Sequence, residues 1–322
     1  MKTPISMMLK MYYDRKREIA QKKLRALPKE TAKVKLDFKS LNIAPKIDNP
    51  FLYLNPNDEG ISVDLYAWGF REPINTHMLF RFISEEKRNI DAVIDIGSNL
   101  GYFPTIELAS GARQVIAIEP VPETYAFLKE NINRFKNSKA LNVAISDKKE
   151  NLKMYIPTKL NLATVLAKAV SMNIEIGKVP IKEIVNVQAL SLENIVKSEG
   201  LTNANVLIRM DIEGFEREVL KNIPKEVYGL SFELHAHILG YEATLTLLKK
   251  LHNFGYKIRT VVREAQGLYP IIKWLGLRKA LQLYQKVAKK TRILNKLDPD
   301  LLRDMIRYNE VSHIFAVRSE IH

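Results

Sequence analysis

From residue 91 onward, short apolar runs alternate with stretches whose apolar residues recur at helical spacing. The apolar runs predict strands at 92–96, 114–119, 140–145, 152–156, 205–211, 230–234, 256–261 and 313–317. The amphipathic stretches predict helices at 103–110, 122–136, 190–198, 214–222 and 241–253. Because nearly continuous apolar strands are typical of a sheet covered on both faces, the pattern predicts a mostly parallel α/β sheet with helices on either side.

The pattern before residue 91 is different. Residues 6–27 predict a basic amphipathic helix, and prolines and a glycine interrupt the chain between 31 and 60. Short strands are predicted at 51–54 and 61–65, and a helix at 74–86. These segments suggest an additional layer on the N-terminal side of the α/β domain.

We therefore divide the chain into three parts. Residues 1–50 form a basic N-terminal helical arm, residues 51–90 a cap of strands and a helix, and residues 91–322 the main domain. A long basic segment at about 265–310 separates the last two predicted strands, and its apolar residues predict at least one amphipathic helix.

Composition narrows the class of protein. The 322 residues are 46% apolar and 27% charged, as in ordered globular proteins. Cysteine is absent, which excludes disulfides, thiolate zinc sites, iron–sulfur clusters and a cysteine nucleophile. No apolar run approaches the roughly 18 residues of a membrane span, and the first residues do not resemble a signal peptide. We therefore expect a cytoplasmic protein.

The positive charge is concentrated in two segments. The net charge is +14, of which residues 1–30 carry +6 and residues 273–307 carry +7. Such basic segments suggest an anionic partner, and basic amphipathic helices can lie on an anionic membrane surface. The alternative is that both helices pack their apolar faces on the core and expose their lysines to water. We expect peripheral contact with a membrane as one outcome.

The clearest chemical motif is VIDIGSNLGYF at 93–103, a strand followed by a glycine turn and a helix. Glycine at such a turn permits positive φ and close approach of a ligand. Asn99 stands where a dinucleotide-binding motif has its second glycine, and no phosphate-binding loop is present, so NAD, FAD and nucleoside triphosphates are not favoured. An acidic strand end with two glycines suits a zwitterionic ligand such as S-adenosylmethionine.

The next strands extend this prediction. Glu119 ends the second strand 18 residues after Gly101, where a carboxylate can accept hydrogen bonds from ribose hydroxyls. Ser146 and Asp147 follow the third strand and are placed to flank an adenine ring. The predicted donor-binding residues are therefore Asp95, Gly97, Asn99, Gly101, Glu119, Ser146 and Asp147.

Five ordered segments, DIGSNLGYF, IEPVPETYAFLKENI, NVAISD, RMDIEGFEREVL and FELHAH, resemble the FkbM family of S-adenosylmethionine-dependent methyltransferases over about residues 60–260. The resemblance implies a Rossmann-like class I methyltransferase fold with seven strands, the last antiparallel, and O-methylation of a sugar, glycan or other small molecule. Ala189-Leu190-Ser191 departs from the family's frequent Thr-Leu-Asp, and the arm and insertion lie outside its core.

Candidate catalytic residues follow the fourth and fifth strands. Asp211 and Glu213 stand at the carboxyl edge of the sheet and could orient or deprotonate a hydroxyl, or hold a divalent cation. His235 ends the fifth strand and could accept the hydroxyl proton. We assign Asp211, Glu213 and His235 as catalytic and no residue as a metal ligand. We interpret Glu216 as a helix N-terminal carboxylate with a structural role.

Two other functions compete with this interpretation. A nucleic-acid methyltransferase could hold phosphates with the basic segments, but the Pro-Pro-aromatic motif of base-amino methylases and interleaved aromatic residues are missing. A non-catalytic, membrane-associated protein that binds S-adenosylmethionine is disfavoured by the intact set of acidic and histidine residues. Nucleic acid is therefore an unlikely partner, and the sequence does not name the methyl acceptor.

Overall fold

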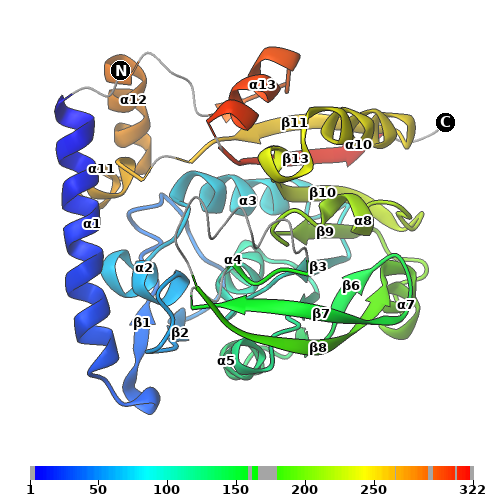
Figure 1. Cartoon of the computed structure of the whole chain (residues 1–322), viewed down its shortest axis with the longest axis horizontal. Helices are drawn as coiled ribbons and strands as arrows, with labels where there is room; N and C mark the ends of the chain where they lie inside the picture. Colours follow the sequence, from blue (N-terminus) through cyan, green and yellow to red (C-terminus); the bar gives the residue numbers. More distant parts are fainter. Residues whose placement is uncertain are drawn as a thin grey trace.

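The computed structural model describes residues 4–158, 162–165, 180–264, 266–288, 293–308 and 310–319. Its centre is one sheet with the strand order β5 (Ser138–Leu141), β4 (Val115–Ile118), β3 (Ala92–Ile96), β9 (Val206–Met210), β10 (Val227–Leu234), β13 (Ser312–Arg318), β11 (Tyr256–Val262) and β12 (Ile293–Leu294) (Figure 1). The strands from β5 to β10 run parallel, and β13 is antiparallel to both β10 and β11. This confirms the predicted fold class, with β12 added as a two-residue edge strand.

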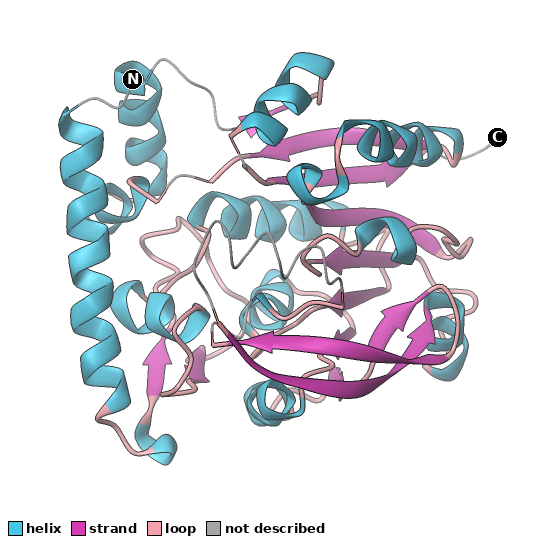
Figure 2. Cartoon of the chain, viewed as in Figure 1, coloured by secondary structure: helices cyan, strands magenta, loops and turns pink. Residues whose placement is uncertain are grey.

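Helices cover both faces of the sheet (Figure 2). One face packs against α3 (Pro73–Glu86) and α4 (Tyr102–Ser110), and the other against α7 (Leu192–Ser198), α10 (Tyr241–Asn253) and α13 (Pro299–Arg307). Successive residues of a strand point to opposite faces of the sheet. Val93 therefore packs in the core that contains α3 and α4, and Ile94 in the core that contains α7, α10 and α13. The helix α5 (Pro122–Ile132) lies against β5.

A smaller sheet stands beside the main one and consists of β6 (Ala144–Ser146), β8 (Ile181–Ser191) and β7 (Glu150–Pro157). The strand predicted at 140–145 is therefore two strands, β5 and β6, in different sheets. The break falls at Asn142, whose side chain donates to the backbone oxygens of Glu119 and Pro120. The long strand β8 was not predicted, because its exposed outer positions carry polar residues.

The N-terminal residues form α1 (Pro4–Arg25), η1 (Lys29–Thr31), β1 (Lys33–Lys35), β2 (Phe51–Tyr53) and α2 (Ile61–Trp68). The predicted strand at 61–65 is wrong, since these residues begin α2. Asp58 explains the difference: its carboxylate accepts the backbone N–H groups of Gly60 and Ser62 at 2.8 Å each and satisfies donors at the helix start.

Among its described residues, the insertion before the last strand contains the helices α11 (Leu268–Leu275), α12 (Leu277–Ala288) and α13, as predicted, together with the edge strand β12. One hydrophobic core joins Tyr13 and Leu24 of the arm, Trp68 of the cap and Leu207 of the main sheet. The boundaries at residues 50 and 90 stay a prediction. No helix among the described residues is long and apolar enough to cross a membrane.

Candidate active site

A cavity of about 550 Å³ opens at the carboxyl edge of the main sheet. The loops after β3, β4, β9 and β10 supply its polar wall, and the small sheet supplies Ile145 and Met154. The predicted residues that line it are Gly97, Asn99, Glu119, Asp211, Glu213 and His235. Ligands of such sheets bind at this edge, so the cavity is the candidate active site.

The glycine turn after β3 is fixed by close packing. Gly97 has φ +77°, and a Cβ there would lie 2.1 Å from the backbone oxygen of Asp211. Asn99 also adopts positive φ, at 49°. The Ser98 hydroxyl donates to the backbone oxygen of Asp95 and accepts the N–H of Ile118, which ties the turn to β4. Gly101 packs against α5 and does not line the cavity.

Glu119 stands opposite this turn and is almost fully buried. Its two carboxylate oxygens accept the backbone N–H groups of Asn99 and Val121, both at 2.9 Å. Burial raises the pKa of Glu119 to about 7, more than these two hydrogen bonds lower it. A carboxylate offers about four lone-pair positions, so Glu119 retains acceptor capacity toward the cavity.

Asp95, whose contact with the donor stays a prediction, is buried beneath the glycine turn. It lies inside β3, and the register of the sheet pairs it with Arg209 of β9. Its Oδ1 accepts from Arg209 at 3.2 Å, and its side chain is fully buried away from the cavity wall. Burial raises the pKa of Glu107, whose carboxyl donates a hydrogen bond to Asp95. Asp95 therefore belongs to a buried polar network beneath the turn.

Ser146 and Asp147 also lie outside the cavity wall. The Ser146 hydroxyl donates to Glu150 at 2.6 Å, and Asp147 accepts from Lys221 at 3.1 Å. The side chains that flank the donor half of the cavity at this level are Val143 and Ile145. A contact from Ser146 or Asp147 to the donor stays a prediction without support from their positions.

Asp211 and Arg209 connect the two halves of the site. Arg209 donates to Asp211 Oδ2 at 3.2 Å and lies over the ring of Phe103. Burial favours the neutral carboxyl, but Arg209 and a hydrogen bond from Glu233 outweigh it and hold the pKa of Asp211 at about 2. Asp211 is therefore ionised throughout the neutral range and is a weak base.

Glu213, His235 and Glu216 form a second group. His235 Nε2 lies 3.4 Å from Glu213, and Nδ1 lies 2.7 Å from Glu216, which is fully buried and also accepts the N–H of Gly214 at 3.0 Å. Burial alone would lower the pKa of His235, but Glu216 and Glu213 raise it well above its usual range. Burial raises the pKa of Glu213 to about 7.

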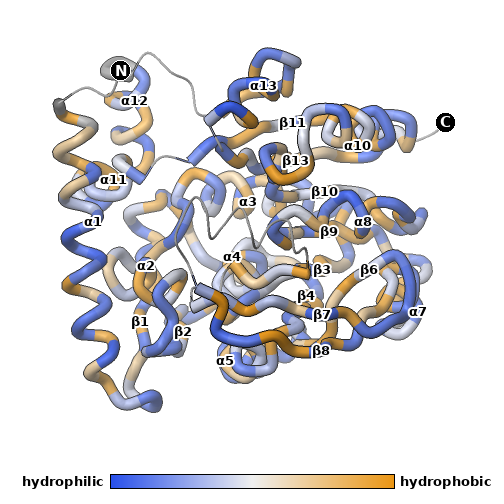
Figure 3. The backbone as a smooth tube through the Cα atoms, in the orientation of Figure 1, coloured by the Kyte–Doolittle hydropathy of each residue, from blue (hydrophilic) through white to orange (hydrophobic). Residues whose placement is uncertain are grey.

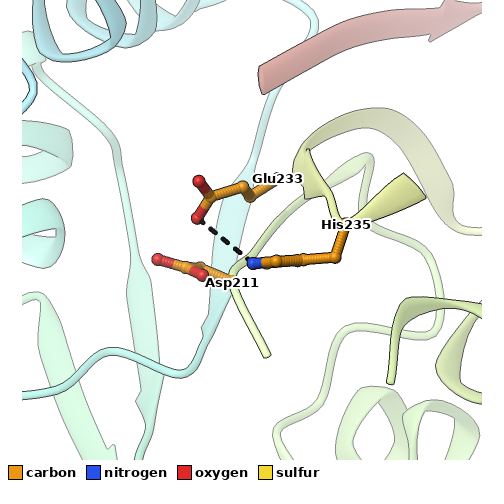
Figure 4. Close-up of side chains that lie close together, drawn as sticks. All are labelled: Asp211, Glu233 and His235. Atoms are coloured by element: carbon orange, nitrogen blue, oxygen red, sulfur yellow. Dashed lines mark ion pairs between the residues drawn. The ribbon is translucent and has the colours of Figure 1, made fainter. Parts of the chain in front are cut away.

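A third carboxyl, Glu233, lies next to this group (Figure 4). One ligand atom each from Asp211, Glu233 and His235 fall within 4.8 Å of one another, close enough to surround a divalent cation. His313 is the cross-strand neighbour of Glu233, and its Nε2 lies 3.4 Å from Glu72.

The sequence analysis did not assign Arg71 and Glu233, which line the cavity, and it gave Glu216 no link to His235. It also missed the charged residues that pair with lining residues, which are Glu72, Arg209 and His313. Glu216 is the nineteenth residue before His235, so only the folded chain shows that they touch. Arg209 had a usable signal, since a charged residue inside an apolar strand needs a buried partner on the neighbouring strand.

A parallel sheet that ends in the antiparallel strand β13, with a glycine turn and a facing carboxylate at its carboxyl edge, is a class I methyltransferase fold. Residues 95–258 match the methyltransferase FkbM domain. The chain belongs to the FkbM methyltransferase family and is a methyltransferase.

One curated relative is the hexuronic acid methyltransferase AglP of Haloferax volcanii, 26% identical over 184 residues, which are 56% of this chain and 71% of that protein. Solved structures give weaker likenesses. A SAM-dependent methyltransferase of Agrobacterium tumefaciens matches 77% of this chain and 62% of its own at 12% identity and a TM-score of 0.36. A precorrin-6y C5,15-methyltransferase of Geobacter metallireducens matches 76% and 89% at 10% identity and 0.33.

Proposed function

We propose that this protein uses S-adenosylmethionine to methylate a hydroxyl group of a sugar or glycan. The observation that supports this most is the division of one cavity into a donor half and an acidic–histidine half. The donor would supply an electrophilic sulfonium methyl group, and the chain's own residues would position it and accept the proton of the hydroxyl.

The chemistry of the residues that line the donor half supports S-adenosylmethionine as the donor. Glu119 would accept hydrogen bonds from the ribose hydroxyls, and the turn at Gly97 and Asn99 would hold the amino-acid end. The apolar side chains of Val143 and Ile145 would flank the adenine. Gly97 and Asn99 both have positive φ, and this turn conformation allows the donor to approach the backbone closely.

In the acceptor half, we assign Glu213 as the base that accepts the proton of the hydroxyl. A carboxylate with a pKa of about 7 is well matched to proton transfer near neutral pH. His235, which the sequence analysis favoured as base, is held in its charged form by Glu216 and Glu213 and would position Glu213 and the acceptor. In the reaction the hydroxyl O–H bond breaks, the proton moves to Glu213, an O–C bond forms and the methyl–sulfur bond breaks.

The acceptor class rests on the relative and on the polarity of the cavity. The relative is named for methylation of a hexuronic acid. The acceptor half here carries Asp211, Glu213 and Glu233, which are good acceptors for several sugar hydroxyls.

Incubation of native extract with donor labelled in its methyl group tests this function. We expect a labelled carbohydrate after mass spectrometry and loss of that label with the Glu213→Gln protein. Label in RNA or DNA would contradict the proposal. A parallel reaction with chelator decides whether the group Asp211, Glu233 and His235 needs a cation, since only then does activity fall.

Peripheral association with an anionic membrane stays a prediction. The exposed face that would carry it is formed by α1 and α11.

A further inference from the structure

Exposed large apolar side chains gather at one end of the molecule. Among the described residues, nine of twelve such side chains belong to α1, α11 and α12. We call six of them the anchor face: Met8, Met11, Tyr12 and Ile19 of α1 with Trp274 and Leu275 of α11. Met8 and Met11 are each 69% exposed and Trp274 is 61% exposed. Figure 3 shows apolar positions along α1 at the edge of the molecule.

The anchor face is one surface built from two segments far apart in the sequence. The rings of Tyr12 and Trp274 lie 5.5 Å apart, and α1 runs beside α11 and α2 (Figure 1). The opposite side of α1 holds Tyr13, Ala20 and Leu24, which are buried in the core. Packing of α1 therefore does not need the exposed apolar side chains.

Positive charge surrounds these apolar residues. Residues 4–25 carry seven basic and two acidic side chains, and residues 266–288 carry four basic and none acidic. Helical spacing of three and four places the exposed residues Arg15, Lys22 and Lys23 beside Tyr12 and Ile19. Acidic Asp14 is paired with Lys10 instead. Apolar side chains with a basic border match the headgroup region of an anionic bilayer.

We propose that the anchor face docks on an anionic lipid membrane, with Trp274, Met8 and Met11 inserted among the acyl chains near the headgroups. Tryptophan and tyrosine favour this interface because their rings are apolar with one polar group. A second copy of the chain is a poorer occupant, since it would bring one strongly basic face against another.

A hydrogen bond and a shared segment of chain connect the anchor face to the active-site cavity. Tyr269 of α11 accepts a hydrogen bond from the backbone N–H of Glu72 at 2.7 Å, next to cavity residue Arg71. Gln266, at the start of the same segment, lines the cavity. Docking would hold the cavity close to the bilayer, which suits an acceptor carried on a lipid. This last step rests on the proposed function, whereas membrane binding itself does not.

Intrinsic fluorescence and sedimentation of the full chain test the proposal without donor or acceptor. The chain has two tryptophans, and Trp68 is buried, so Trp274 reports on the exposed face. We expect co-sedimentation with phosphatidylcholine vesicles that contain phosphatidylglycerol, weaker binding as salt rises, and a blue shift of the Trp274 emission. Pure phosphatidylcholine vesicles should bind little.

Variants locate the binding to the anchor face. Lys22→Glu with Lys23→Glu should weaken vesicle binding by tenfold or more, since each basic residue contributes about 1 kcal/mol near an anionic surface. Met8→Ser with Met11→Ser should also weaken it, whereas Tyr308→Ala, an equally exposed aromatic outside the face, should not. Circular dichroism should show that each variant is folded.

Four results would overturn the proposal, of which three concern vesicles. These are no sedimentation with anionic vesicles at low salt, equal binding of the Lys22→Glu/Lys23→Glu protein, or binding without a change in Trp274 emission. Preferential retention on RNA would overturn it as well. Methyl transfer to a soluble sugar is measured separately, so failure of docking leaves the proposed function intact.

Discussion

The two halves of the cavity are built in different ways. The polar part of the donor half comes from the loops that directly follow β3 and β4, within the 24 residues from Gly97 to Pro120, and Val143 and Ile145 from the next segment complete it. The acceptor half combines loops after β9 and β10 with Arg71 from the N-terminal segment and Gln266 from the insertion. The donor half is a local structure, whereas the acceptor half exists only after distant parts of the chain have packed.

This difference separates donor binding, which many proteins can share, from the acceptor chemistry, which is particular to this protein. A turn made from one strand–helix connection can bind the same donor in many proteins. The acceptor half depends on charged groups that face one another across the sheet, and two of its residues, Arg71 and Gln266, lie outside the matched residues 95–258. We therefore expect substitutions in the donor half to change binding and those in the acceptor half to change the rate.

The largest expected effect is on the rate, with Glu213→Gln. Loss of a general base should reduce methyl transfer by about 10²–10⁴-fold. The wild-type rate should fall as pH drops below about 7, because Glu213 must be ionised to accept the proton, and this fall should disappear in the variant. Initial rates with labelled donor from pH 5.5 to 8.5, an interval around that pKa, are the measurement. A rate unchanged by the substitution would remove Glu213 from this role.

The next largest effect is a loss of stability when Gly97, in the glycine turn after β3, is replaced by alanine. The new Cβ would meet the backbone oxygen of Asp211, and positive φ would add strain. We expect a loss of unfolding free energy of about 3 kcal/mol. The matched control is Gly200→Ala, which has φ +71° but open space around it, and should lose about 1 kcal/mol. Equal losses in urea unfolding would show that packing at Gly97 is unimportant.

A smaller effect concerns the pH dependence of donor binding. Ionised Glu119 accepts the ribose hydroxyls, and its pKa is raised to about 7 by burial. The wild-type affinity for S-adenosylhomocysteine should therefore weaken as pH falls from 8 to 6, an interval across that pKa. Glu119→Gln should flatten this dependence, and calorimetric titration at each pH measures it. An equally steep profile in the variant would assign the proton to another group.

The smallest effect on the free energy of unfolding is expected for Glu107→Gln. Glu107 is a buried neutral carboxyl that donates to Asp95, and a glutamine amide can donate the same bond. We expect stability within about 0.5 kcal/mol of the wild type, whereas Glu107→Ala should lose about 2 kcal/mol or more because Asp95 keeps no such donor. Similar losses in both variants would mean that shape, rather than the hydrogen bond, matters at this position.

The sequence was sufficient to predict those parts of the fold and site that depend on residues close together in the chain. The seven main strands and the glycine turn follow from periodicity, and Glu119 follows from its distance to Gly101. The donor contact of Asp95 stays a prediction, because its position inside β3 could be predicted but its pairing with Arg209 on the neighbouring strand could not. The pairing of His235 with Glu216 could not be predicted, because it depends on how the loops after β9 and β10 meet.

The strand predicted at 61–65 failed for a related reason. Its β-branched residues favour a strand, but Asp58 satisfies the first N–H groups and the segment forms α2 against α1. Such local preferences are weak compared with capping and packing. The anchor face likewise had a basic signature in the sequence, whereas its exposed methionines and Trp274 emerge only from the packing of α1 against α11.

The affinity of Glu119→Ala and Glu213→Gln proteins for S-adenosylhomocysteine, measured side by side by calorimetry, tests the division of the cavity most directly. We predict that Glu119→Ala weakens binding by about 10- to 100-fold through loss of charge-assisted hydrogen bonds. Glu213→Gln should bind within about twofold of the wild type, because it acts only on the acceptor. Unchanged binding by Glu119→Ala, or strong weakening by Glu213→Gln, would contradict the account.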